Sequence, residues 1–130
     1  MLAVSRQLGI QNEVIPRIAT PFGGGIGGRG EVCGAVTGSI MAIGLKFGRE
    51  EPSQPNRHAY ALAREFCQRF EGETGNIYCR ELIGMDISTP EGLQAYRRTD
   101  VPLRVCLPAA GAAFRIVMEL LQRPAPAADD

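Results

Sequence analysis

The sequence predicts an all-α protein, a compact bundle of five to seven helices, two of them short, with a glycine-rich loop leading into a central helix. Three observations support this fold class. Apolar residues recur at steps of three and four, which is the period of a helix with one buried face. No segment shows the apolar–polar alternation that is typical of a half-buried strand. Glycine, proline and capping residues divide the periodic pattern into pieces of helical length.

Two predicted helices precede the glycine-rich loop. The first covers residues 1–8 and ends at Gly9, a residue type that often terminates helices. The second is short and covers Glu13–Ala19 behind Asn12, whose side chain is suited to an N-cap. Thr20-Pro21 ends it, because the residue before a proline is pushed out of the helical region.

The central helix is predicted to run from about Glu31 to Phe47, directly behind the loop Phe22–Gly30. Gly34 on its flank costs about 1 kcal/mol relative to alanine, and we interpret it as a place where another backbone or a bound group comes close. Gly27 and Gly30 in the loop can adopt backbone conformations that are closed to residues with a Cβ. Gly27, Gly30 and Gly34 are therefore candidate cofactor contacts.

The second half of the sequence predicts further helices. A long one covers about Arg57–Glu71, and a short one covers Tyr78–Ile83. The next begins with the capping-box sequence Ser88–Glu91 and ends near Arg98. The last covers about Leu103–Leu121, and its apolar stripe begins at a cysteine.

Length and charge narrow the class of protein. With 130 residues, the chain is expected to form one helical domain over residues 1–123 and a disordered tail over 124–130. The 14 Lys and Arg residues balance the 14 Asp and Glu residues, so no nucleic-acid or membrane partner is expected. No apolar run reaches the roughly 20 residues that span a bilayer, and no signal-peptide core is present. We therefore expect a cytoplasmic, prokaryotic protein whose thiols stay reduced.

Three of the four cysteines share one predicted setting. Cys33, Cys79 and Cys106 each lie in the first turn of a predicted helix, at the head of its apolar stripe. Free N–H groups and the positive end of the helix dipole favour a thiolate there. If these helix ends converge, the three thiolates would suit an iron–sulfur cluster, a soft metal ion or a reactive thiol group. Free cysteine also fills cores as a small hydrophobe, so a purely structural role stays open.

The remaining cysteine, the single histidine and one glycine motif give little indication of a functional site. Cys67 lies in mid-helix between Phe66 and Phe70, and we interpret it as structural. His58 is the only histidine and is expected to be exposed. A single histidine without a CxxCH motif means that no haem of the usual covalent type is expected. The loop Gly25–Gly30 spells GxGxxG, but a helix precedes it where the dinucleotide motif has a strand, so no nucleotide is expected.

Several segments stand out when they are read together: Phe22–Gly25 (FGGG), Cys33–Gly38 (CGAVTG), Cys79–Leu82 (CREL) and Cys106. They resemble the redox-active protein family that is named for its cysteine pattern C…GCAxxG…C…C, and the resemblance covers about Leu2 to Leu121. The resemblance implies a helical redox module in which Cys33, Cys79 and Cys106 are the second, third and fourth motif cysteines. A similar module is associated with an iron–sulfur centre in split-Soret cytochromes.

The sequence departs from the family pattern at two points. Glycine follows Cys33, where the family pattern places it before the cysteine. The first motif cysteine, expected a few residues ahead of Leu2–Val4, is absent, and we expect the native start to lie upstream and to supply it. Three ligands from one chain would leave a coordination position for that cysteine, for a second subunit or for an exogenous ligand.

Three functional hypotheses follow. In the first, Cys33, Cys79 and Cys106 hold an iron–sulfur cluster or another thiolate-bound metal in an electron-transfer or redox module. In the second, the chain is a thiol-based redox enzyme or sensor, with Cys33 as the reactive thiolate and Cys79 or Cys106 as the resolving partner. In the third, it is a structural or partner-binding bundle with buried cysteines. The sequence identifies no redox partner protein, and a homodimer is compatible with it.

Overall fold

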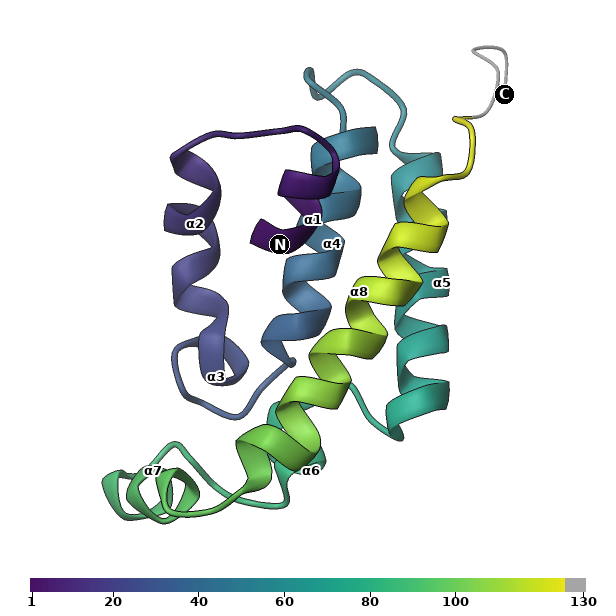
Figure 1. Cartoon of the computed structure of the whole chain (residues 1–130). Coiled ribbons are helices and arrows are strands. Elements are labelled where there is room, and N and C mark those ends of the chain that lie inside the picture. The colour runs from purple at the N-terminus through teal and green to yellow at the C-terminus, as the bar shows by residue number, and fades with distance from the viewer. Residues whose placement is uncertain (126–130) are drawn as a thin grey trace.

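The computed structural model describes residues 1–125, so most of the predicted tail, residues 126–130, lies outside the described residues (Figure 1). Its helices are α1 (Leu2–Gln7), α2 (Val14–Ala19), α3 (Gly23–Ile26), α4 (Gly34–Phe47), α5 (Arg57–Thr74), α6 (Cys79–Ile83), α7 (Pro90–Arg97) and α8 (Leu107–Leu121). The α3 segment is a tight turn rather than a regular helix, because Gly24 and Gly25 have positive φ. Among the described residues, the other seven α-helices confirm the predicted all-α bundle with its central helix α4.

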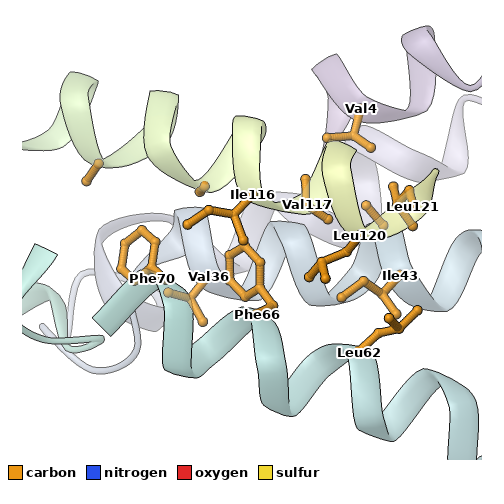
Figure 2. Close-up of a cluster of buried hydrophobic side chains, with 13 residues drawn as sticks. Val4, Val36, Ile43, Leu62, Phe66, Phe70, Ile116, Val117, Leu120 and Leu121 are labelled. Carbon is orange, nitrogen blue, oxygen red and sulfur yellow. The ribbon is translucent and has the colours of Figure 1, made fainter. Parts of the chain in front are cut away.

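Three long helices, α4, α5 and α8, pack side by side and enclose the main core (Figure 1). Figure 2 shows side chains from these helices and from α1 pointing toward one another: Val4, Val36, Ile43, Leu62, Phe66, Phe70, Ile116, Val117, Leu120 and Leu121. The rings of Phe66 and Phe70 stack with their centroids 5.9 Å apart. Burial of one large apolar side chain contributes about 1.5–3 kcal/mol. This cluster therefore fixes the helices on which the site is built.

A smaller hydrophobic cluster lies at the end of the bundle that holds α6 and α7 (Figure 1). Its buried members are Cys79, Ile83 and Ile87. A π-helical segment, Pro102–Cys106, joins this cluster to α8 and packs against α6. The small cluster thus contains two of the three motif cysteines, since Cys106 also packs against it.

The central helix starts later than the sequence predicted. It begins at Gly34 instead of about Glu31, and Cys33 is its N-cap, with extended backbone angles of φ −56° and ψ 136°. Cys33 therefore lies immediately before the first turn rather than inside it.

The last helical stretch starts slightly earlier than its predicted start at about Leu103. The carbonyl of Asp100 accepts hydrogen bonds from the N–H groups of Leu103 and Arg104, both at 3.0 Å, so the chain is helical from Val101 onward. Cys106 consequently lies in the second turn rather than the first. Pro108 has no N–H to donate to the carbonyl four residues earlier, which interrupts the regular α-helical pattern beside the π-helical segment.

Within the described residues, no single helix is both long enough and apolar enough to cross a membrane. The pair Pro90–Arg97 and Pro102–Leu121 reaches the required length and composition only when both are taken together, and it is bent by 77°.

Candidate functional site

Cys33 and Cys79 are brought together by a short pairing of the two segments that lead into their helices. The segments form an antiparallel β-bridge. Beside it, the Cys33 N–H donates to the carbonyl of Ile77 (2.8 Å), and the Cys79 N–H donates to the carbonyl of Glu31 (2.7 Å). These bonds require extended backbone at residues 31–33, which explains the late start of α4. The starts of α4 and α6 are thereby fixed next to each other.

The glycine-rich loop closes directly over Cys79. Gly25 is buried with a φ of +67°, and a Cβ built on it would lie 2.7 Å from the Cys79 Cβ and 2.6 Å from the Glu31 backbone nitrogen. Neither the angle nor the space suits any residue other than glycine. The sequence analysis missed Gly25, because nothing in a run of glycines shows which one meets another segment.

The glycines that were predicted to contact a cofactor lie against the chain itself or toward solvent. A Cβ on Gly30 would meet the Arg80 Cβ at 3.1 Å, and one on Gly34 would meet the Phe22 carbonyl oxygen at 3.2 Å. Gly27 is exposed. The N–H groups of residues 27–31 all donate to carbonyls within or beside the loop. The loop is therefore held by its own hydrogen bonds, and a cofactor contact at these glycines stays a prediction.

Arg80 ties the loop to α6. Its guanidinium donates to the carbonyl of Arg29 (2.9 Å) and forms an ion pair with Asp86 (3.4 Å). The backbone N–H of Arg80 donates to the carbonyl of Gly30 (3.0 Å). An exposed ion pair of this kind contributes about 1 kcal/mol or less. The contribution of Arg80 is therefore mainly to hold the loop in place above Cys79.

Cys106 reaches the same site from the π-helical segment. It is half-buried against the small cluster that contains Cys79. The hydroxyl of Tyr96 on α7 lies 3.3 Å from the Cys106 sulfur, which is within hydrogen-bond distance for a sulfur atom. The sequence analysis missed Tyr96 as well, because its contact with Cys106 depends on how α7 folds back onto the chain.

Burial and neighbouring sulfurs change the proton affinity of the site. Cys79 is only 9% exposed, and burial raises the pKa of its thiol to about 11, with further contributions from the charges on Cys33 and Cys106. Burial, followed by the hydrogen bond with Cys106, raises the pKa of the Tyr96 hydroxyl to about 12. The direction at Cys79 is opposite to the thiolate expected at a helix start. The pairing of the segments before α4 and α6, and the packing of Cys106 against the cluster that contains Cys79, bring the three motif cysteines to one region of the folded chain.

Cys67 and His58 belong to α5 in the main bundle. Cys67 is half-buried against the main core, where burial raises its pKa, with a smaller contribution from Glu71. This position supports the structural interpretation of Cys67. His58 is half-buried rather than exposed as predicted, because its ring meets the edge of Phe47 with centroids 4.7 Å apart.

The three motif cysteines are not arranged as the ligands of a metal ion in this structure. In residues 1–125, no three His, Cys, Asp or Glu side chains are arranged as ligands of one metal ion. Cys33 and Cys106 are half-buried, and a change of rotamer moves a sulfur without moving its helix. The arrangement suits thiol chemistry among the sulfurs, or metal binding that accompanies such a rotation.

A family defined by its cysteine pattern matches nearly the whole chain. Residues 1–120 match the model of the family described as Putative redox-active protein (C_GCAxxG_C_C). No curated protein and no solved structure matches the chain. The match includes the glycine-rich loop and all three motif cysteines, and it confirms the resemblance seen in the sequence. The chain belongs to this redox-active family.

Proposed function

We propose that the protein is a redox module in which Cys33, Cys79 and Cys106 together hold an iron–sulfur cluster or another thiolate-bound metal. One observation carries the proposal: the paired segments before α4 and α6 place Cys33 and Cys79 at adjacent helix starts, and Cys106 packs against the buried cluster that contains Cys79. Three ionised sulfurs in such a place repel one another and are poorly solvated, so their ionisation requires a cation. A soft metal ion or an iron–sulfur cluster supplies positive charge and has a strong affinity for thiolates.

Each of the three sulfurs is held by a different part of the fold. Cys33 is the N-cap of α4, Cys79 is fixed beneath Gly25, and Cys106 lies on the stretch that continues into α8. The bound metal or cluster would supply one-electron transfer, with a separate redox partner protein as donor or acceptor. A tetrahedral thiolate site needs four ligands, so one ligand would come from outside this set of three.

The test is anaerobic purification of the full chain, followed by reconstitution with iron and sulfide. We expect visible absorption, together with iron and sulfide contents that fall strongly in Cys33→Ser, Cys79→Ser and Cys106→Ser. Cys67→Ser is the matched control, because it alters a half-buried cysteine of α5 and should leave the metal content unchanged. Colourless, metal-free native protein after reconstitution would overturn the proposal, as would an equal loss of metal in the Cys67→Ser control.

A second candidate function is thiol–disulfide exchange, which is favoured by the lack of a ready metal-ligand arrangement in the described part of the chain. The Cys33 thiolate would attack an external disulfide and release one thiol from it. Cys79 or Cys106 would then displace the second thiol and form a disulfide with Cys33. Two protein thiols lose two electrons and two protons in this reaction, and the external disulfide gains them.

Equilibration of the metal-free protein in glutathione redox buffers tests the second candidate. We expect peptide mapping to find a disulfide between Cys33 and either Cys79 or Cys106, with Cys67 remaining a free thiol. A protein that keeps all its thiols free in a fully oxidised buffer would contradict thiol–disulfide exchange at this site.

A further inference from the structure

The Tyr96 side chain connects α7 to the cysteine site. Its hydroxyl lies 3.3 Å from the Cys106 sulfur, and its half-buried ring packs against the small hydrophobic cluster that contains Cys79. No residue of α7 is fully buried, so half-buried side chains such as Leu93 and Tyr96 are what attach this helix to the rest of the molecule. The position of the Tyr96 hydroxyl is therefore set by packing of its ring.

The chemistry of the two groups decides which one donates the hydrogen bond. A phenol hydroxyl is a good donor, a thiol is a weak donor, and a thiolate can only accept. We therefore assign Tyr96 as the donor and Cys106 as the acceptor. A hydrogen bond to an ionised group is roughly twice as strong as one between neutral groups, so this bond strengthens as negative charge builds up on the sulfur.

We propose that Tyr96 is a positioning residue, which fixes the Cys106 sulfur beside Cys79 and raises the reduction potential of the cysteine site. The inference rests on the proposed function, because it takes Cys33, Cys79 and Cys106 as the redox-active group. Hydrogen bonds to sulfur ligands are among the factors that set the potential of a thiolate-bound centre.

The direction of the effect is the same for both candidate chemistries. If Cys106 were a ligand of a bound cluster, the Tyr96 hydroxyl would stabilise the additional negative charge that its sulfur gains when the cluster takes up one electron. Reduction of a disulfide takes up two electrons and two protons and leaves two thiols, one of which would be the Cys106 sulfur that accepts the bond. In each case the hydrogen bond favours the reduced form.

Tyr96→Phe tests the inference, because it removes the hydroxyl and keeps the packed ring. We expect the midpoint potential of the site to fall, with the equilibrium constant for reduction changing about tenfold. That change corresponds to about 30 mV for a two-electron couple and about 59 mV for a one-electron couple. Tyr78→Phe is the matched control, since Tyr78 directly precedes Cys79 but is 46% exposed, and its loss of a hydroxyl should leave the potential unchanged.

A second replacement strengthens the hydrogen bond instead of removing it. Site-specific 3-fluorotyrosine at Tyr96 is a stronger donor, so the midpoint potential is expected to increase in the order phenylalanine, tyrosine, fluorotyrosine. The tyrosine ring vibrations of the metal-free, reduced protein give an independent readout, because Cys106→Ala should change the hydrogen-bond signature of Tyr96.

The outcomes separate this inference from the proposed function. Equal midpoint potentials in the native, Tyr96→Phe and fluorotyrosine proteins would overturn the inference and leave the redox module intact. A native protein that shows no redox couple, with metal or without, would overturn the proposed function and the inference together.

Discussion

The thiol of Cys79 experiences two opposing effects. It begins a helix, where the dipole favours a thiolate, but α6 has only five residues, and the Cys79 N–H is already bonded to Glu31. Burial and the charges of the two neighbouring sulfurs favour the protonated form. The effect of burial on the thiol outweighs the effect of the helix dipole. Without a cation, Cys79 is therefore a neutral thiol at neutral pH.

The raised pKa of Cys79 predicts a loss of stability at alkaline pH. The unfolded thiol loses its proton near pH 9 and the folded one near pH 11, so the folded chain binds more protons between these values. The free energy of unfolding should therefore fall as the pH rises through this window, by on the order of 2 kcal/mol from this thiol. Urea unfolding of the metal-free protein at several pH values, compared with Cys79→Ala, measures the effect. An equal fall in the variant would contradict the prediction.

Replacement of Gly25 by alanine, the smallest possible change in side chain, is expected to lower the stability of the fold strongly. Gly25→Ala should destabilise the protein by about 2 kcal/mol or more, because the new Cβ has a positive φ and overlaps Cys79 and Glu31. Gly28→Ala is the control, since Gly28 has a φ of +79° but open space around it, and should cost only about 1 kcal/mol. Thermal unfolding compares the two variants, and equal losses would show that contact with Cys79 does not matter.

At the scale of helices, local signals predicted most elements well. The second helix was expected at Glu13–Ala19 and is found at Val14–Ala19, with the Asn12 side chain accepting from the Val14 N–H at 2.9 Å. Helix α5 was expected at Arg57–Glu71 and is found at Arg57–Thr74. In these cases the apolar period lies within the element, so the sequence contains the information needed.

Helix starts at the site depend on distant partners and could not be predicted in this way. The start of α4 is displaced because residues 31–33 pair with the segment before α6, which only the folded chain brings near. Cys33, Cys79 and Cys106 were singled out because each is close to a predicted helix start, and their role as a site stays a prediction. Gly25 and Tyr96 were not singled out, since their importance comes from contacts made across the tertiary structure.

The start of α7 allows a test of which residue is its cap. The sequence predicted a cap at Ser88, but the structure places Thr89 there, with its hydroxyl accepting from the Gly92 N–H at 3.0 Å. Thr89→Ala should therefore lower the free energy of unfolding by about 1 kcal/mol. Ser88→Ala should cost less, because the Ser88 hydroxyl bonds to the Asp86 side chain instead. A larger loss in Ser88→Ala would favour the cap predicted from the sequence.

At the scale of the whole molecule, two hydrophobic clusters of unequal size share the chain. The main core joins α1, α4, α5 and α8 and has thirteen buried residues, whereas the small cluster has three among the described residues. Regions with few buried apolar contacts open at lower free energy than the main core of a protein. The end of the molecule that holds α7 should therefore be its least stable part.

Amide hydrogen exchange followed by mass spectrometry checks this ranking. Peptides from Pro90–Arg97 should exchange well before peptides from Leu107–Leu121, because α7 has no buried residue and α8 has six. Phe66→Ala, which damages only the main core, should speed exchange in α8 more than in α7. Simultaneous exchange of both helices in the native protein would indicate one cooperative unit instead.

The motif cysteines are distributed over both hydrophobic clusters, so a bond between them would connect the two. Cys33 packs against the main core, while Cys79 and Cys106 belong to the small cluster. A disulfide or a metal that connects Cys33 to either of the others would add a cross-link between the two clusters, beside the main-chain hydrogen bonds that already join the starts of α4 and α6. Oxidation or metal loading in the interior would then restrain α7 at the surface, and a protein that binds there would distinguish the two states without touching a sulfur atom.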